Sequence, residues 1–150
     1  MKPEETVDFH IRWAWAKIAR MYNQEAGKAG GTMSVGYVLL NIDKGGTPST
    51  RLGPKMGMES RSLTRTLKSM EEAGLIIRVP DEVDKRVMLV NLTDKGFEMR
   101  ERSKLAVVHF NDFIRQHINA SKLKNFFEVM GEINSLLENN NIFQNDNHTT

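Results

Sequence analysis

A change in the spacing of apolar residues at Gly74 constrains the fold of this chain more than any other feature of its sequence. Before Gly74, apolar residues recur at every third or fourth position, which is the period of a helix face. After it, Leu75–Val79 and Arg86–Leu92 are short runs rich in β-branched and other apolar residues, and they flank the turn-like stretch Pro80–Lys85. The sequence therefore predicts a β-hairpin that directly follows a helix.

Two short helices are predicted ahead of the hairpin. Thr47 is suited to cap the first, Pro48 fits its first helical position, and Gly57 tolerates the left-handed backbone that ends many helices. The second begins at Ser60 and ends at Gly74. Two short helices joined by a turn with glycine are typical of a helix-turn-helix. The side chains expected to face inward from the second helix are Leu63, Leu67 and Met70, with Thr66 beside them.

Basic residues gather on this same segment. The net charge of the whole chain is only +2, which does not by itself indicate a nucleic-acid partner. Between Lys44 and Met70, however, there are six basic residues and a single acid, Glu59. A solvated helix face is the ordinary explanation for such a run, but its position on a helix-turn-helix favours DNA binding.

Longer amphipathic helices are predicted towards both ends of the chain, over Val7–Tyr22, Thr93–His117 and Ser121–Glu138. We therefore expect one domain of a mainly α-helical (α+β) class with a small β-hairpin wing. Its winged helix-turn-helix lobe is expected at about 33–92, its terminal helices at about 7–24 and 93–138, and a disordered tail at 139–150.

Composition and missing motifs exclude several classes of protein. The chain has no cysteine, which removes disulfides, thiolate metal sites and thiol switches. It has no apolar run long enough to cross a bilayer and a charged rather than signal-like start, so we expect a cytoplasmic protein without a membrane partner. It also lacks a phosphate-binding glycine loop, an HExxH motif and a serine nucleophile elbow. We expect no enzymatic activity and no cofactor.

The segment around the hairpin resembles the wing of the MarR (multiple antibiotic resistance regulator) family of bacterial transcription regulators. The resemblance rests on three linked pieces: Gly74-Leu75-Ile76-Ile77-Arg78, Asp84-Lys85-Arg86 and Leu92-Thr93-Asp94-Lys95-Gly96. These look like the family's GLI-x-R, D-x-R and LT-x-x-G blocks. The resemblance implies a homodimer formed by helices from both chain ends, and a repressor as the default mode of action.

Two departures from the family pattern concern the wing. The family often has two arginines at the wing tip, whereas the middle residue here is Lys85, and the hairpin also carries Asp81 and Glu82. Both departures predict weaker wing contacts with DNA.

The helix that begins at Ser60 is expected to enter the major groove of duplex DNA. The residues of this helix that lie away from its inward-facing apolar side are Ser60, Arg61, Ser62, Thr64, Arg65 and Lys68. Arg61 and Arg65 are the better candidates for reading bases, because arginine donates two hydrogen bonds to guanine. The alternative is that either arginine only pairs with Glu59, Glu71 or Glu72 along the helix.

The remaining DNA contacts are predicted on the wing and the first short helix. Arg86 is suited to the minor groove beside Lys85, and the resemblance implies that Asp84 steadies it; a hairpin salt bridge without a DNA role is the alternative. Arg51 and Lys55, together with Lys68, are expected to contact phosphates. A two-fold dimer predicts an inverted-repeat operator with half-sites about one helical turn apart.

The resemblance also implies a small aromatic or phenolic effector bound near the dimer helices. Candidate residues for such a pocket are His10, Arg12, Trp13, Trp15 and Tyr37. The alternative is that these aromatic side chains simply belong to the core.

Two other functions stay open at this stage. A winged helix can serve protein contacts instead of DNA, although a basic rather than apolar recognition helix argues against it. A metal-responsive sensor is conceivable from the histidines and one acid towards the chain ends, which are His10, His109, Asp112 and His117. We nevertheless predict no metal site.

Overall fold

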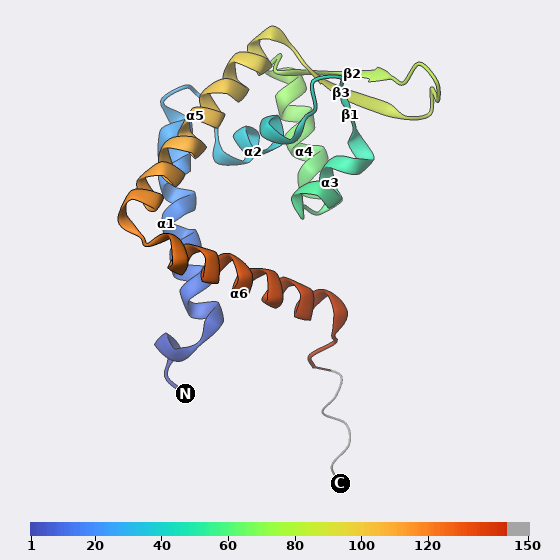
Figure 1. The fold of residues 1–150 in the computed structure, drawn as a ribbon. Coiled ribbons are helices and arrows are strands. Elements are labelled where there is room, and N and C mark those ends of the chain that lie inside the picture. Colours follow the sequence, from blue (N-terminus) through green and yellow to red (C-terminus); the bar gives the residue numbers. More distant parts are fainter. Residues whose placement is uncertain (144–150) are drawn as a thin grey trace. The chain divides into compact units, whose positions relative to one another are not determined.

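A computed structural model of the chain describes residues 1–143 and shows two compact units (Figure 1). The first is formed by Met1–Val107, and the second begins at Val108. The boundary falls within helix α5 (Asp94–His117).

The first unit contains five helices, counting the beginning of α5, a short 3-10 helix and three strands among its described residues. In chain order, the elements before α5 are the 3-10 helix Pro3–Glu5, α1 (Val7–Gly27), α2 (Met33–Asn41), β1 (Thr47–Pro48), α3 (Ser49–Met56), α4 (Ser60–Glu72), β2 (Ile76–Pro80) and β3 (Met88–Leu92). The described part of the second unit consists of the end of α5 and α6 (Ala120–Asn139). The mainly helical winged fold predicted from the sequence is confirmed.

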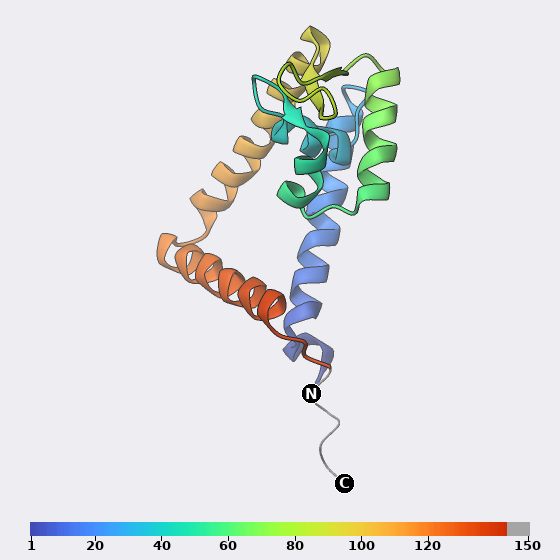
Figure 2. The same ribbon diagram turned by 90° about the vertical axis from the view of Figure 1, so that its right-hand side faces the viewer.

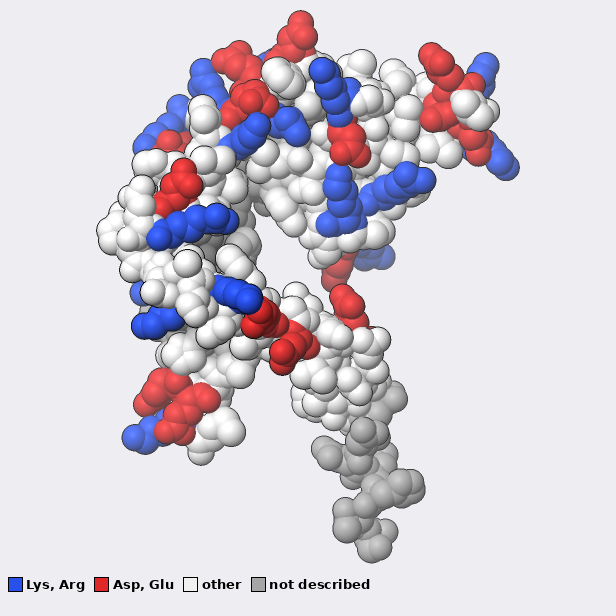
Figure 3. Space-filling view, in the orientation of Figure 1, with Lys and Arg blue, Asp and Glu red and all other residues white. Residues whose placement is uncertain are grey.

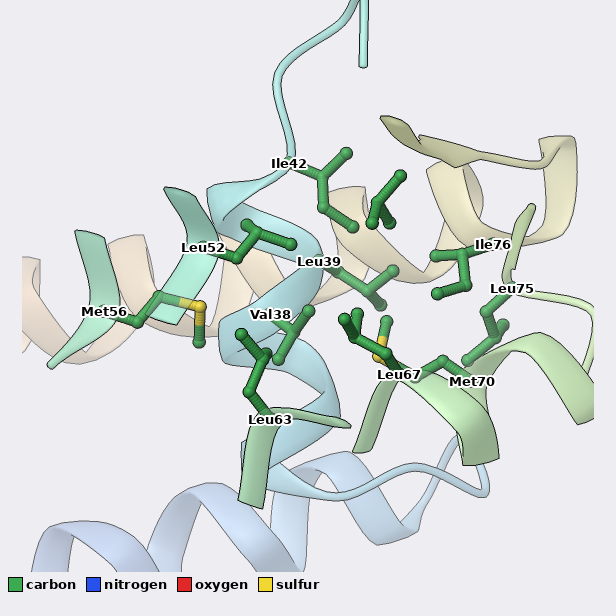
Figure 4. Close-up of a cluster of buried hydrophobic side chains, with 11 residues drawn as sticks. Val38, Leu39, Ile42, Leu52, Met56, Leu63, Leu67, Met70, Leu75 and Ile76 are labelled. Carbon is green, nitrogen blue, oxygen red and sulfur yellow. The ribbon is translucent and has the colours of Figure 1, made fainter. Parts of the chain in front are cut away.

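The core of the first unit lies between α2, α3, α4 and the sheet (Figure 4). Helix α4 contributes the three residues that its apolar spacing predicted, Leu63, Leu67 and Met70. Facing them from the other elements are Val38, Leu39, Ile42, Leu52, Met56, Leu75, Ile76 and Val90. Because α3 and α4 share this one core, burial of apolar surface fixes the helix-turn-helix as a unit.

The two helices of the helix-turn-helix end in the same way. Gly57 and Gly74 have φ values of 63° and 71°, in the left-handed region that glycine adopts without strain. After each helix, two backbone N–H groups donate to carbonyl oxygens of its last turn. At the end of α3, Gly57 donates to Pro54 and Met58 donates to Gly53. At the end of α4, Gly74 donates to Glu71 and Leu75 donates to Met70. Both ends are therefore Schellman motifs, as the glycine positions predicted.

The predicted N-cap at Thr47 is wrong. Thr47 and Pro48 form the short strand β1, which pairs antiparallel with β3 through Thr47 opposite Val90, so α3 begins at Ser49. Pairing in the sheet satisfies the Thr47 backbone, and its buried hydroxyl is engaged with Asp43 instead of capping a helix. The sheet therefore has three strands in the order β1-β3-β2, one more than the predicted hairpin.

The hairpin itself is shorter than predicted. Strand β3 starts at Met88 instead of Arg86, because the backbone N–H of Val87 turns back to the carbonyl of Asp84 at 2.9 Å. Arg86 therefore lies in the connection between the strands, beyond the last pair, Pro80 with Met88. This places the arginine at the tip of the wing.

The terminal helices bury little within a single chain. Neither α1 nor α6 contains a buried residue. In the described part of the chain, no helix has the length and apolar character needed to cross a membrane. Of the tail for which we predicted disorder, Asn139 still belongs to α6, and residues 144–150 lie outside the described residues.

Candidate nucleic-acid interface

Helix α4 presents its polar face to solvent along the outer side of the first unit (Figure 2). All of the predicted base-reading and phosphate-binding residues on this helix are exposed. They are Ser60, Arg61, Ser62, Thr64, Arg65 and Lys68. The apolar spacing that buries the other face of α4 also determines which residues it offers to a partner.

The two arginines of α4 are free. Neither Arg61 nor Arg65 makes an ion pair or hydrogen bond with any residue in the described part of the chain. Glu71, one of the acids considered as their partner, accepts a hydrogen bond from the Nε of Arg78 at 2.9 Å instead. The guanidinium groups are thus available to a ligand without the loss of an existing contact.

The hydroxyl group of Thr64 is already in use as a donor. It donates to the carbonyl oxygen of Ser60 at 2.8 Å, one turn earlier in α4. Towards a partner it therefore presents its methyl group and the free lone pairs of its oxygen, which accept hydrogen bonds.

The wing tip is organised by two aspartates. Asp84 receives two side-chain hydrogen bonds from Arg86, from Nε at 3.0 Å and from Nη2 at 3.2 Å, and one from the Arg86 backbone N–H. These side-chain and backbone hydrogen bonds lower the pKa of Asp84 below its ordinary value. Asp81 accepts the N–H groups of Val83 and Asp84 and so closes the turn. Because the Arg86 side chain remains 91% exposed, the pair orients the guanidinium without covering it.

Charges of both signs meet at this tip, whereas basic side chains gather where α3 and α4 lie (Figure 3). Glu82 and Lys85 are exposed beside Arg86 and make no ion pair with any described residue. The weaker wing contacts predicted from Lys85, Asp81 and Glu82 stay a prediction, and Asp81 has in addition a structural role in the turn.

The blocks of the wing motif meet at one corner of the fold. The Thr93 hydroxyl donates to the carbonyl of Gly74 at 2.6 Å and accepts the N–H of Gly96 at 3.0 Å, while the Thr93 N–H donates to Leu75 at 3.1 Å. Lys95 adds a bond from its Nζ to the carbonyl of Ala73 at 2.9 Å. These contacts fix the end of α4 to the start of α5, which explains the spacing between the blocks.

An open groove of about 530 Å³ lies beside α3. Its charged lining residues are Asp43, Arg51 and Lys55. Arg51 is exposed and makes no ion pair or hydrogen bond with a described residue, whereas Lys55 is bonded to Asp43 and to the carbonyl of Asn41. Sequence reasoning missed Asp43 altogether, because a single aspartate in a loop carries no recognisable pattern.

The five residues predicted for an effector pocket lie on α1 and α2. Trp13 and Trp15 are 55% and 56% exposed, so neither belongs to the core of one chain. His10 contacts the Glu4 carbonyl at 2.7 Å, Arg12 lies 4.0 Å from Asp8, and the Tyr37 hydroxyl donates to the Met56 carbonyl at 3.5 Å. None of the five lines the groove at α3 or the smaller cavity beside α6, which Leu123 and Phe127 help to line.

The histidines of the described residues, His10, His109 and His117, do not form a cluster. Within residues 1–143, no three His, Asp or Glu side chains come together in a way that would hold a metal ion. His117 instead contacts the carbonyl oxygen of Phe113 at 2.8 Å. This arrangement gives the metal-responsive alternative no support.

Comparison with known proteins finds similarity to transcription regulators over the segment that contains the site. Residues 38–88, which run from the last turn of α2 to the start of β3, match the MarR family model. An uncharacterized HTH-type transcriptional regulator of Bacillus subtilis, YdgJ, is 30% identical over 88 residues, which are 59% of this chain and 54% of that protein. The chain thus spans about half the length of this curated relative.

Solved structures share the fold over most of the chain. The structure of Staphylococcus aureus MepR with DNA has a TM-score of 0.81 at 16% identity, over 88% of this chain and 98% of that one. The PcaV regulator of Streptomyces coelicolor, solved with its natural ligand, has a TM-score of 0.77 at 19% identity, over 90% of this chain and 96% of that one. At these identities the likeness establishes the fold.

Proposed function

We propose that this chain is a MarR-type, sequence-specific regulator of transcription that binds double-stranded DNA, and the match of residues 38–88 to the MarR family model supports the proposal. The observation that carries the proposal is the pair of exposed, unpaired arginines on α4, Arg61 and Arg65. A buried apolar face holds this helix rigidly while its cationic face stays free, which suits it to the major groove.

The other predicted contacts keep their roles within this proposal, except for Lys55, which is bonded to Asp43. Arg86, oriented by Asp84, enters a minor groove beside Lys85, and Arg51 and Lys68 contact phosphates. Arg61 and Arg65 read base edges, with the hydroxyl groups of α4 around them. Each arginine that donates two hydrogen bonds to guanine contributes about 1–3 kcal/mol of discrimination between bases.

We further propose that the terminal helices α1, α5 and α6 join two copies into a homodimer, so that both units belong to one MarR-like domain. Large apolar side chains on α6 are more than half exposed in the single chain, among them Phe126, Phe127, Leu136 and Leu137. Exposed apolar surface of this extent marks an interaction site. The duplex bound by such a dimer is an inverted repeat.

The resemblance to the same family is also the basis for proposing regulation by a small molecule. We propose that the protein is a cytoplasmic repressor released by a small aromatic or phenolic effector, for which the natural ligand in the PcaV structure is the supporting precedent. The effector lowers DNA affinity only by the difference between its own affinities for the two states of the protein. Trp13, Trp15 and Tyr37, exposed in the single chain, are its candidate contacts together with His10 and Arg12.

The experiment that tests DNA binding is selection from a pool of random duplexes by the purified protein at two salt concentrations. We expect an inverted repeat to be enriched and its affinity to fall steeply with salt, because bound cations release counterions from DNA. Arg65→Glu is expected to abolish retention. Lys104→Glu, an equal change of charge at an exposed position on α5, is expected to preserve it, and analytical ultracentrifugation checks that this control has the same oligomeric state as the wild type. Failure of the wild-type protein to retain any duplex at low salt contradicts the proposal.

A further inference from the structure

Lys55 and Arg51 lie one turn apart on α3 and line the same groove, yet their surroundings differ. The Nζ of Lys55 donates to the carbonyl oxygen of Asn41 at 3.0 Å and to Oδ1 of Asp43 at 3.3 Å. Arg51 has no such partner among the described residues. Two cations that look equivalent in the sequence are therefore in different states: one is neutralised within the protein and the other is free.

The partner of Lys55 is itself held by the sheet. The buried hydroxyl of Thr47, a residue only 2% exposed, accepts the backbone N–H of Asp43 at 2.8 Å and donates to its Oδ2 at 3.2 Å. Thr47 belongs to β1 and pairs with Val90 of β3, one of the two strands of the wing. A continuous line of contacts thus runs from α3 through Lys55, Asp43 and Thr47 to the wing sheet.

Two of the three N–H groups of the Lys55 ammonium are already donated within the protein, so a phosphate that approached Lys55 would find one donor left and the carboxylate of Asp43 beside it. The hydrogen bond from Lys55, its positive charge and the hydrogen bond from Thr47 all lower the pKa of Asp43, in that order, and Arg100 adds a smaller effect in the same direction. The carboxylate is therefore ionised at neutral pH and cancels the charge of Lys55. A cation that is already neutralised releases few additional counterions when DNA binds.

We propose that Lys55 and Asp43 are positioning residues that fix the helix-turn-helix relative to the wing, and that Arg51 alone makes the phosphate contact in this groove. The proposal rests on the DNA-binding function proposed above. It assigns Lys55 a role different from the phosphate contact that its charge suggests. Removal of Lys55 then weakens DNA binding through misalignment of two DNA-contacting parts, not through a lost charge at the DNA.

The salt dependence of binding separates the two roles. Affinity for the selected duplex is measured at several salt concentrations for the wild-type protein and for Arg51→Met, Lys55→Met, Asp43→Ala and the double variant of Asp43 and Lys55. Arg51→Met is expected to reduce the slope of log affinity against log salt by about 0.9 for each arginine removed, or about 1.8 for a dimer. Lys55→Met is expected to lower affinity about two- to fivefold, as for a partly exposed ion pair, with the slope unchanged.

Substitution of Asp43 distinguishes most sharply between the two roles considered for Lys55. If Lys55 and Asp43 act as one positioning pair, Asp43→Ala weakens binding as Lys55→Met does, and the double variant is no weaker than either single one. If Lys55 is instead a phosphate contact that Asp43 restrains, Asp43→Ala strengthens binding and steepens the slope, and Lys55→Met flattens it as Arg51→Met does. Either of these last results overturns the proposal.

Two controls keep the outcomes distinct. Thermal unfolding of each variant shows that it is folded at the assay temperature, and Lys55→Arg, which can retain the ion pair, is expected to restore most of the affinity. Absence of any binding by the wild-type protein at low salt is a failure of the proposed DNA-binding function. Binding by the wild type together with a flattened slope for Lys55→Met is a failure of the positioning proposal alone.

Discussion

Substitution of Gly96 by alanine is expected to destabilise the protein strongly, because this residue lies against the backbone of the chain. A Cβ atom added at Gly96 would lie 1.9 Å from the carbonyl oxygen of Leu75 and 2.9 Å from its carbonyl carbon. Contacts below 3.0 Å require the atoms to move apart. The obstructing atom is backbone, and it already accepts the N–H of Thr93 at 3.1 Å.

The size of the effect follows from what has to move. Overpacking of a tight site costs about 1–3 kcal/mol. Displacement of the Leu75 carbonyl also weakens its hydrogen bond with Thr93, which contributes about 0.5–1.5 kcal/mol. We therefore expect Gly96→Ala to lower the free energy of unfolding by about 2–4 kcal/mol.

Urea unfolding followed by circular dichroism, at one fixed protein concentration, measures this loss. Gly27→Ala is the matched control in the same unit, because an added Cβ there meets nothing within 4 Å at the last residue of α1. It is expected to be neutral or to stabilise the protein by up to about 1 kcal/mol. A loss below about 0.5 kcal/mol for Gly96→Ala would refute the close approach of α5 to Leu75.

Two further substitutions and one pH dependence test other parts of the structure. Thr47→Val removes the buried hydroxyl from Asp43 and is expected to lower the free energy of unfolding by about 1–3 kcal/mol in the same urea assay; an unchanged value would contradict the buried contact. Phe127→Glu, on the exposed apolar face of α6, is expected to convert the dimer to monomer in analytical ultracentrifugation, and a persistent dimer would exclude this face from the interface. The ion pair of Asp84 with Arg86 is expected to be fully formed above the ordinary carboxyl pKa and to be lost only as the pH falls through the lowered pKa of Asp84. The Arg86 Nε–H resonance is therefore expected to stay constant from about pH 5 to 8. A shift of that resonance within this range would show that the pair does not persist.

Local patterns in the sequence were sufficient to predict α4. Its three buried residues follow the helical period, and Gly74 ends it in the left-handed conformation that a glycine at this position indicates. The residues of α4 that do not belong to this buried face form its exposed face. The candidate contacts Arg61 and Arg65 could therefore be named without a structure. That neither arginine makes an ion pair or hydrogen bond within the described residues could not be predicted, since the sequence left Glu59, Glu71 and Glu72 open as partners, and only the structure shows Glu71 bonded to Arg78.

Interactions between distant parts of the chain account for what the sequence did not predict. Thr47 has the chemistry of a helix cap, but pairing with Val90 draws it into a strand of only two residues, which is too short for any alternation to be visible. In the same way, Asp43 and Lys55 are twelve positions apart, and only the fold brings their side chains within 3.3 Å. A local propensity is overridden wherever a buried nonlocal partner is available.

Most of the residues that carry the family resemblance differ from the residues that we propose read DNA. Gly74, Thr93 and Gly96 form the corner between α4, the sheet and α5, where hydrogen bonds and a lack of space for a Cβ fix the geometry. None of them lies on the exposed face of α4. Two blocks of the motif therefore specify the frame that holds α4 and the wing, and the third, Asp84-Lys85-Arg86, lies at the wing tip. In the proposed function, the choice of operator depends on exposed positions such as Arg61 and Arg65, where substitution leaves the core intact. Such a division allows the same frame to recognise many different operators. Exchange of the exposed residues of α4 between regulators of this fold should therefore transfer sequence preference without loss of stability.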